Sequence, residues 1–208
     1  MPTLSQSEIA ALLQPYLVPA QPASPHAATA LGQPLLQSLS DYLEILLKWN
    51  ARTNLTAIRG PQEIVQRHFG ESLFAAQHLA PTGTLLDFGS GAGFPGLPIQ
   101  LLHPARQVTL AESQHKKSAF LREAVRTLQL PTQVWAARVE QMPPAQRFDT
   151  VTLRAVDDMA AALAAARARV AAGGQLAVLT TRALAPAGSD LHALPLSDAG
   201  VLALLRLD

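Results

Sequence analysis

The sequence predicts an α/β fold in which helices cover both faces of a mostly parallel, twisted sheet, preceded by an N-terminal helical extension. Two observations predict it. From residue 84 onward, short apolar runs alternate with helical segments, an order that builds parallel sheets. A glycine-rich turn also follows the first apolar run directly, as in folds that bind ligands at the carboxyl ends of their strands. We place the boundary between a helical extension, 1–80, and a sheet domain, 81–208.

The first part of the chain predicts three helices separated by polar segments. A short helix covers 7–17, and 21–34 is rich in Ala, Pro and Gln and predicts a loop. Pro34 opens an amphipathic helix, because leucines recur at steps of three and four. These leucines are Leu35, Leu36, Leu39, Leu43, Leu46 and Leu47. A polar connection, 49–60, leads to a further helix over 61–78.

The second part predicts six strands with helices between them. The predicted strands are 84–88, 107–112, 132–137, 148–155, 175–180 and 201–207. The predicted helices are 94–102, 115–129 and an alanine-rich helix over 157–172, which Gly173 and Gly174 end.

Composition excludes several kinds of chemistry. The chain has no cysteine, so a thiolate nucleophile, a cysteine-ligated zinc and an iron–sulfur cluster are excluded. No spacing of His, Asp and Glu suggests a metal site. No run of eighteen apolar residues appears, and the N-terminus lacks the basic-then-apolar order of a signal peptide. We therefore expect a cytoplasmic protein with no metal and no membrane contact.

Charge is nearly balanced overall but clustered locally. The formal net charge is +1, so any nucleic-acid footprint must come from local clusters. Two stretches are rich in basic side chains: Lys48, Arg52, Arg59, Arg67 and His68, then His115, Lys116, Lys117, Arg122 and Arg126. Solvated helix faces are the alternative interpretation.

The glycine-rich turn allows two spacings. Four glycines and two prolines fall within residues 89–98. Gly89, Gly91 and Gly93 give G-x-G-x-G, whereas Gly91, Gly93 and Gly96 give the G-x-G-x-x-G of dinucleotide-binding folds. On spacing alone the two are nearly equal, so a nicotinamide-dependent oxidoreductase remains an alternative.

Charge distinguishes the two cofactors. Asp87 stands at the end of the first strand, where we expect it to face the ligand. A carboxylate there repels a pyrophosphate but attracts the sulfonium and ammonium of S-adenosylmethionine. Glu112, at the end of the second strand, is placed to accept hydrogen bonds from a ribose diol; a surface carboxylate that caps the next turn is the alternative.

Several segments together resemble one known family. DFGSGAGFPGLP from Asp87, AESQHKKSAFL from Ala111, ARVEQ from Ala137 and DTVTLRA from Asp149 are similar to the bacterial ribosomal RNA small-subunit methyltransferase G family. NLTAIRG from Asn54 and the HFGES stretch, 68–72, resemble the same family. The resemblance covers about 35–180.

The resemblance implies a Rossmann-like S-adenosylmethionine-dependent methyltransferase fold and methyl transfer to N7 of one guanine in 16S rRNA of the small ribosomal subunit. Gly89, Phe94, Val139, Glu140 and Arg154 match the family's cofactor-binding positions. Asp87, Gly91 and Glu112 complete the cofactor-binding set that we expect. We also expect Arg154 to act in catalysis, by stacking on the base or pairing with a carboxylate; a surface arginine at a strand end is the alternative.

The expected RNA-binding residues come from the two basic stretches and the polar connection between the helices. They are Asn54, Arg59, His68, Lys116 and Lys117. Phe94 is expected to stack on the base or the adenine, with packing inside the protein as the alternative. We expect the protein to act as a monomer.

The expected chemistry needs few catalytic groups. N7 of guanine carries a lone pair and no proton, so its methylation needs no general base. Carbon-5 pyrimidine methylation typically uses a cysteine, which is absent, and the Asn/Asp-Pro-Pro-aromatic loop of amino methylation is replaced by Arg154–Ala155–Val156.

The sequence departs from the family at two places. Glu71 stands where the family usually has Asp, and Thr180–Thr181–Arg182 where it usually has Lys-Gly. These departures, with a short tail rich in Pro and Ala, leave a non-catalytic rRNA-binding or assembly factor as the alternative from another functional class.

Overall fold

The computed structural model describes residues 4–17, 31–154 and 158–208. Within them, seven strands form one sheet in the order β3-β2-β1-β4-β5-β7-β6. The strands are β1 Thr84–Phe88, β2 Gln107–Ala111, β3 Gln133–Trp135, β4 Phe148–Arg154, β5 Val170–Thr181, β6 Asp190–Ala193 and β7 Gly200–Arg206. Strands β1 to β5 are parallel to one another, and β7 runs antiparallel to both β5 and β6. The predicted mostly parallel sheet is confirmed.

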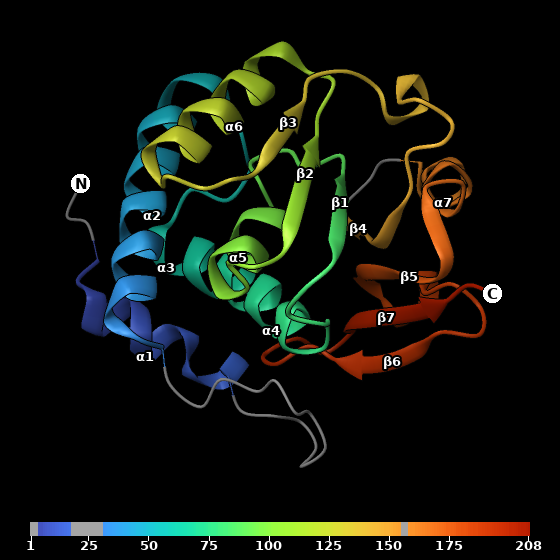
Figure 1. Cartoon of the computed structure of the whole chain (residues 1–208). Coiled ribbons are helices and arrows are strands. Elements are labelled where there is room, and N and C mark those ends of the chain that lie inside the picture. Colours follow the sequence, from blue (N-terminus) through green and yellow to red (C-terminus); the bar gives the residue numbers. More distant parts are fainter. Residues whose placement is uncertain (1–3, 18–30, 155–157) are drawn as a thin grey trace.

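Helices cover both faces of the sheet (Figure 1). The N-terminal helices are α1 Gln6–Leu17, α2 Gln33–Thr53, α3 Pro61–Glu63, the π-helix η1 Ile64–Gly70 and α4 Glu71–Gln77. They are followed by α5 Gly96–Leu102, α6 His115–Thr127, the 3-10 helix η2 Val139–Gln141, α7 Met159–Arg167 and the 3-10 helix η3 Arg182–Leu184. One face of the sheet is covered by α1, α2, α4, α5 and α6, and the other face by α7 (Figure 1).

Alternation along the strands builds a separate apolar core on each face. Leu85 packs into the first core with α1, α2, α4, α5 and α6, whereas Leu86 packs into the second core with η2 and α7. Leu39 of α2 and Leu97 of α5 are both fully buried in the first core. The N-terminal helices thus share one core with the sheet, and a domain boundary at residue 80 stays a prediction.

The structure differs from the predicted elements in three places. Gly173 and Gly174 do not end a helix, since α7 ends at Arg167 and both glycines lie inside β5. A Cβ on Gly174 would lie 2.9 Å from the Asp149 carbonyl oxygen, so glycine lets β5 pass close to β4 where the pairing register shifts. Strand β6 was not predicted, and the helix over 61–78 contains a π-helical segment.

Two predicted segments fall partly outside the described residues. These are most of the loop over 21–34 and residues 155–157, where strand β4 and the next helix were predicted to meet. Among the described helices, none combines the length and the apolar character that crossing a bilayer requires.

Candidate active site

The glycine-rich turn lies at the carboxyl end of β1, between that strand and α5. Phe88, the last residue of β1, is in register with Ala111 of β2 and Leu153 of β4. The residues that follow these partners, Glu112 and Arg154, therefore lie at the same edge of the sheet as the turn. This edge is where parallel α/β folds bind their ligands.

The four glycines of the turn divide into an outer and an inner pair. Gly89 and Gly91 have φ values of +69° and +57°, and an added Cβ would meet nothing within 3.4 Å at either. Gly93 is buried, and its Cβ would lie 2.5 Å from Leu97 and 2.6 Å from the Tyr42 hydroxyl. The outer pair leaves backbone open to a ligand, and the inner pair, Gly93 and Gly96, serves packing.

This division favours the G-x-G-x-G interpretation of the turn. In the dinucleotide-binding spacing, Gly93 would be the second glycine, over which the pyrophosphate approaches the backbone. The Tyr42 hydroxyl instead donates to the Ala92 carbonyl, and Tyr42 and Leu97 occupy the space beside Gly93. A pyrophosphate has no room there.

Asp87 lies beneath the turn, and its side chain is not open to a cleft as we expected. It is fully buried; Oδ2 accepts from the Gly96 amide at 3.1 Å and Oδ1 from the Thr152 hydroxyl at 2.8 Å. Its side chain points to the face of the sheet that α5 covers, which explains the burial. Burial raises the pKa of the Asp87 carboxyl to about 6, although the hydrogen bonds from Thr152 and Gly96 oppose the rise.

Glu112 holds the outer part of the turn from the neighbouring strand. Its Oε2 accepts from the Gly91 amide at 3.0 Å, and its Oε1 accepts from the Gln114 amide at 2.7 Å. Each carboxylate oxygen has a second lone-pair direction. The carboxylate is thus placed between the turn and the start of α6, and it retains acceptor capacity for a ligand's hydroxyl groups.

Arg154 is fixed by groups from the N-terminal helices. Its Nη2 lies 2.7 Å from Glu71 Oε2 and 3.0 Å from the Arg67 carbonyl oxygen, and its Nη1 lies 2.6 Å from His68 Nδ1. The π-helix η1 ends between His68 and Glu71. His68 and Glu71 are three residues apart, so they lie on one face of the helix and both reach the same guanidinium.

His68 is a buried, neutral link in this cluster. A guanidinium only donates, so His68 Nδ1 is the acceptor and Nε2 carries the proton that reaches Thr56 Oγ1 at 2.8 Å. Burial, followed by the charges of Arg154 and Arg67, lowers the His68 pKa to about 3. His68 was predicted to bind RNA, but it is buried and both ring nitrogens are engaged within the protein.

Phe94 is part of an aromatic cluster in which rings of the helices and the turn meet. Its ring stacks on His68 and on Tyr42, with centroid distances of 4.6 and 5.3 Å, and Tyr42 stacks on Phe69. Phe94 is buried. The alternative of packing inside the protein therefore describes Phe94 better than stacking on a base or an adenine.

Val139 and Glu140 lie in η2, which follows β3. Val139 packs into the second core beside Ala111, and the Glu140 side chain is exposed. Trp135, at the end of β3, accepts at its carbonyl oxygen from the Glu112 amide at 3.0 Å, and its indole N–H donates to the Arg138 carbonyl. The hydrogen bond from the Glu112 amide therefore fixes the end of β3 relative to Glu112.

The other predicted RNA-binding residues lie on the surface near this edge. Asn54 and Arg59 are exposed and hydrogen bonded to each other. Lys116 is exposed and Lys117 half-buried in the first turn of α6. Helices α2 and α6 meet where Trp49 contacts Phe120 edge-on, with a centroid distance of 5.8 Å.

Sequence reasoning did not assign roles to Tyr42, Thr56 and Thr152, which support the site from beneath. Their partners lie 50, 12 and 65 residues away in the chain, respectively. The segments that resemble the family contain Thr56 and Thr152, but the resemblance did not reveal these contacts. Across the described residues, no three His, Cys, Asp or Glu side chains gather closely enough to hold a metal ion.

Comparisons with known proteins agree on one family. The family model described as rRNA small subunit methyltransferase G matches residues 35–187. A Chromobacterium violaceum protein of that name is 42% identical over 149 residues, 71% of this chain and 71% of its own length. One from Stenotrophomonas maltophilia K279a is 48% identical over 132 residues, 63% of this chain and 60% of its own length.

Solved structures share the fold at low identity. A ribosomal protein L11 methylase from Lactobacillus delbrueckii has a TM-score of 0.56 at 11% identity and covers 68% of this chain and 79% of its own. M. jannaschii TYW2, solved in complex with AdoMet, has a TM-score of 0.54 at 12% identity and covers 67% and 73%. The sheet order, the outer glycine pair and the family match lead to one conclusion: this chain belongs to the rRNA small subunit methyltransferase G family.

Proposed function

We propose that this chain transfers a methyl group from S-adenosylmethionine to N7 of a guanine in 16S rRNA of the small ribosomal subunit. Membership of the family supports the reaction class and the RNA substrate. The observation that carries the site is the open backbone at Gly89 and Gly91, which lies between Glu112 and Arg154.

In this proposal the residues at the turn bind the cofactor. Glu112 accepts from the ribose hydroxyls, and the backbone at Gly89 and Gly91 lets the ligand approach closely. Val139 and Glu140 border the adenine. Asp87, buried beneath the turn, supplies negative charge at short range to a sulfonium or an ammonium. S-adenosylmethionine supplies the electrophilic methyl group.

For this reaction the protein must position the base and provide a suitable electrostatic field. The N7 lone pair forms the new N–C bond as the S–C bond breaks, the electron pair stays on sulfur, and no proton moves. The guanine ring becomes cationic, so a lone cation beside it would raise the barrier. Glu71 pairs with Arg154 and also lies 3.8 Å from Arg67, which in turn pairs with Glu63. The two carboxylates balance the two guanidinium groups, and the buried His68 is neutral. The cluster can therefore orient the base without adding net positive charge.

The surface residues Asn54, Arg59, Lys116 and Lys117 would contact RNA phosphates. His68 takes a positioning role, since it links Thr56 of the connecting segment to Arg154. We further propose that the protein acts as a monomer in the cytoplasm.

Methyl transfer from isotope-labelled S-adenosylmethionine to small subunits that lack this methylation tests the proposal. Nucleosides are resolved by mass spectrometry, with Arg154→Ala as the comparison. We expect label in 7-methylguanosine, reduced at least tenfold in the variant. Label in another nucleoside would overturn the N7 assignment. Cofactor binding without label would favour the non-catalytic assembly factor, and competition by NAD would favour an oxidoreductase.

A further inference from the structure

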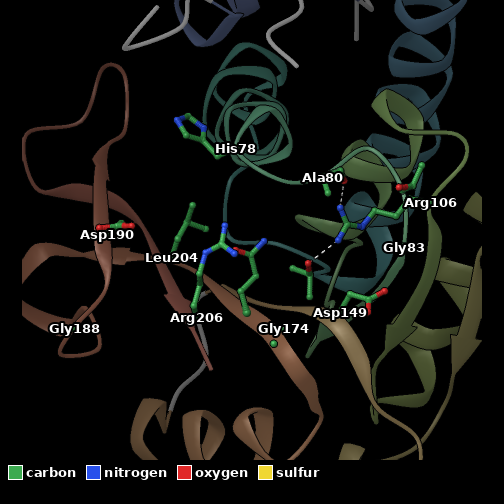
Figure 2. A pocket seen from close by; sticks show the side chains of 14 residues that line it. His78, Ala80, Gly83, Arg106, Asp149, Gly174, Gly188, Asp190, Leu204 and Arg206 are labelled. Carbon is green, nitrogen blue, oxygen red and sulfur yellow. Dashed lines mark hydrogen bonds between the residues drawn. The ribbon is translucent and has the colours of Figure 1, made fainter. Parts of the chain in front are cut away.

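A cavity lies at the edge of the sheet opposite to the glycine-rich turn (Figure 2). Its volume is about 520 Å³. Gly83 precedes β1, Asp149 and Thr150 lie near the start of β4, and Arg206 ends the antiparallel strand β7. Because β1 and β4 run parallel, this is the amino edge of the sheet, and no residue of the proposed active site lines the cavity.

Arg106 brings a buried positive charge to this cavity. Its side chain is 1% exposed; Nη2 donates to the Thr150 hydroxyl at 2.6 Å and Nη1 donates to the Ala80 carbonyl. Nε is buried without a hydrogen-bond partner among the described residues, and no described carboxylate comes within 4.0 Å of the guanidinium. The charge of Asp149 acts on the guanidinium from beyond ion-pair distance. Arg106 therefore has no direct ion pair, although buried charges are normally paired.

Arg206 adds a second unpaired cation. Its side chain is exposed, and within the described part of the chain it forms no ion pair. Figure 2 shows Arg106 and Arg206 extending into the cavity from opposite sides. Two guanidinium groups that face one space are suited to an anion with several oxygens, because each offers donors in a planar fork.

Two carboxylates, Asp149 and Asp190, line the cavity, and Asp149 is held by hydrogen bonds. Asp149 Oδ2 accepts from the Thr84 amide and hydroxyl at 2.7 and 2.9 Å, and Asp190 lies on the far side of Arg206 (Figure 2). They would repel the successive phosphates of an RNA strand, but they can accept hydrogen bonds from a small ligand's hydroxyl groups. The volume exceeds what a bare ion fills and is in the range of small-molecule sites.

We propose that this cavity binds a small phosphorylated molecule, with its phosphoryl group between Arg106 and Arg206 and its hydroxyl groups toward Asp149 or Asp190. The inference does not depend on the proposed function, because the cavity is at the other edge of the sheet. A ligand here would add a direct ion pair to a guanidinium that Asp149 attracts only from a greater distance.

Thermal unfolding of the full chain tests this inference with inorganic phosphate and ribose 5-phosphate as probes. Each probe is added at 10 mM and constant ionic strength. Saturating S-adenosylhomocysteine is also present, so that the proposed cofactor site at the other edge of the sheet is occupied in every sample. If ribose 5-phosphate binds with a dissociation constant near 1 mM, the midpoint should rise by about 3 °C. Inorganic phosphate should give a smaller rise.

Two substitutions with the same charge change separate specific binding from a general salt effect. Arg206→Gln should abolish the rise, whereas Arg182→Gln, an exposed arginine in η3 that does not line the cavity, should retain it. An equal rise in all three proteins, or none in the wild type, would overturn the proposal. It would also be overturned if a tetranucleotide RNA gave the Arg206-dependent rise and ribose 5-phosphate did not.

Discussion

Arg154 and Glu71 form an ion pair between the end of β4 and the start of α4, with 2.7 Å between Nη2 and Oε2. The side chains are only 12% and 11% exposed, so solvent screens the pair weakly. The pair fastens the N-terminal helices to the edge of the sheet where the ligand is proposed to bind. It therefore couples stability to the geometry of the site.

Removing the charge of Glu71 should lower both the stability of the protein and its activity. In Glu71→Gln, Arg154 keeps its charge without a counter-ion, and we expect the free energy of unfolding to fall by about 2 kcal/mol and kcat to fall more than KM rises. Glu71→Asp should retain part of the pair. Glu63→Gln is the control, because its 3.9 Å contact with Arg67 is more than half exposed and contributes at most about 0.5 kcal/mol. Equal losses in Glu63→Gln and Glu71→Gln would contradict the assignment.

The outer and inner glycines should respond differently to alanine. Gly89→Ala has open space for the Cβ, so it should cost only about 1 kcal/mol of stability from the positive φ, yet weaken cofactor binding at least tenfold. Gly93→Ala meets Leu97 and Tyr42 and should cost about 3 kcal/mol or more. Chemical denaturation and calorimetric titration with S-adenosylhomocysteine measure both effects. Loss of folding in Gly89→Ala would show that the outer pair also serves packing.

Asp87 should make stability fall as pH rises. Its pKa is about 6 in the folded protein, against 3.8 for an unperturbed aspartate, so the folded state binds the proton more tightly. The resulting stabilisation, about 3 kcal/mol at most, is complete below pH 4 and is lost between pH 4 and 6. In Asp87→Asn this pH dependence should disappear.

The charge of Asp87 should also affect the affinity for the cofactor. A cationic cofactor favours the ionised carboxylate, so wild-type affinity should rise from pH 5 to pH 7, whereas that of Asp87→Asn should stay low and flat. Equal affinity of the two proteins at pH 7 would rule out the charge complement.

His68 should make stability fall as the pH decreases, which is opposite to the effect of Asp87. Its pKa is lowered from 6.5 to about 3, so the unfolded chain binds the proton first, and the stabilisation is complete above pH 6.5. It is lost as pH falls from 6.5 toward 3, by on the order of 4 kcal/mol. His68→Gln should therefore be less stable than the wild type at pH 7, and this difference should shrink in acid. His115→Gln, at an exposed histidine of α6, is the control and should have about the stability of the wild type at pH 7.

Charge reversal in the first turn of α6 should separate RNA binding from folding. Acidic residues are favoured at a helix N-terminus, so Lys116→Glu with Lys117→Glu should leave stability unchanged or slightly higher. RNA affinity should fall, and the slope of log K against log salt should decrease by up to about 2. Arg122→Glu with Arg126→Glu, farther along the same helix, should have a smaller effect. Equal weakening by both pairs would remove the special role of the first turn.

Local patterns predicted most of the fold but not the strand at its edge. Apolar runs such as that of β1 are typical of buried parallel strands, and the glycine-rich turn marked the ligand edge. Strand β6 has one exposed leucine, Leu191, and pairs only with β7 among the described strands. Its pattern is too short to predict a strand without its partner.

The sequence pointed to candidate residues at the strand ends but not to the buried contacts beneath the glycine-rich turn. Glu112 follows from its position at a strand end, which sequence periodicity locates, whereas Gly89 and Arg154 were assigned from the resemblance to the family. The burial of Asp87 depends on Thr152, 65 residues away, and the engagement of Arg154 depends on Glu71, 83 residues away. Such contacts are tertiary, and a single sequence does not encode them as a local pattern.

The two tryptophans give the protein two built-in optical reporters. Trp49 contacts Phe120 of α6 and borders a groove with Lys48 and Arg52, whereas Trp135 is hydrogen bonded to Glu112 across the strand ends. Trp135→Phe would leave an emission signal beside the basic surface, and Trp49→Phe would leave one beside the proposed ribose position. Fluorescence of these two variants can therefore follow RNA and cofactor separately and reveal which of them arrives first.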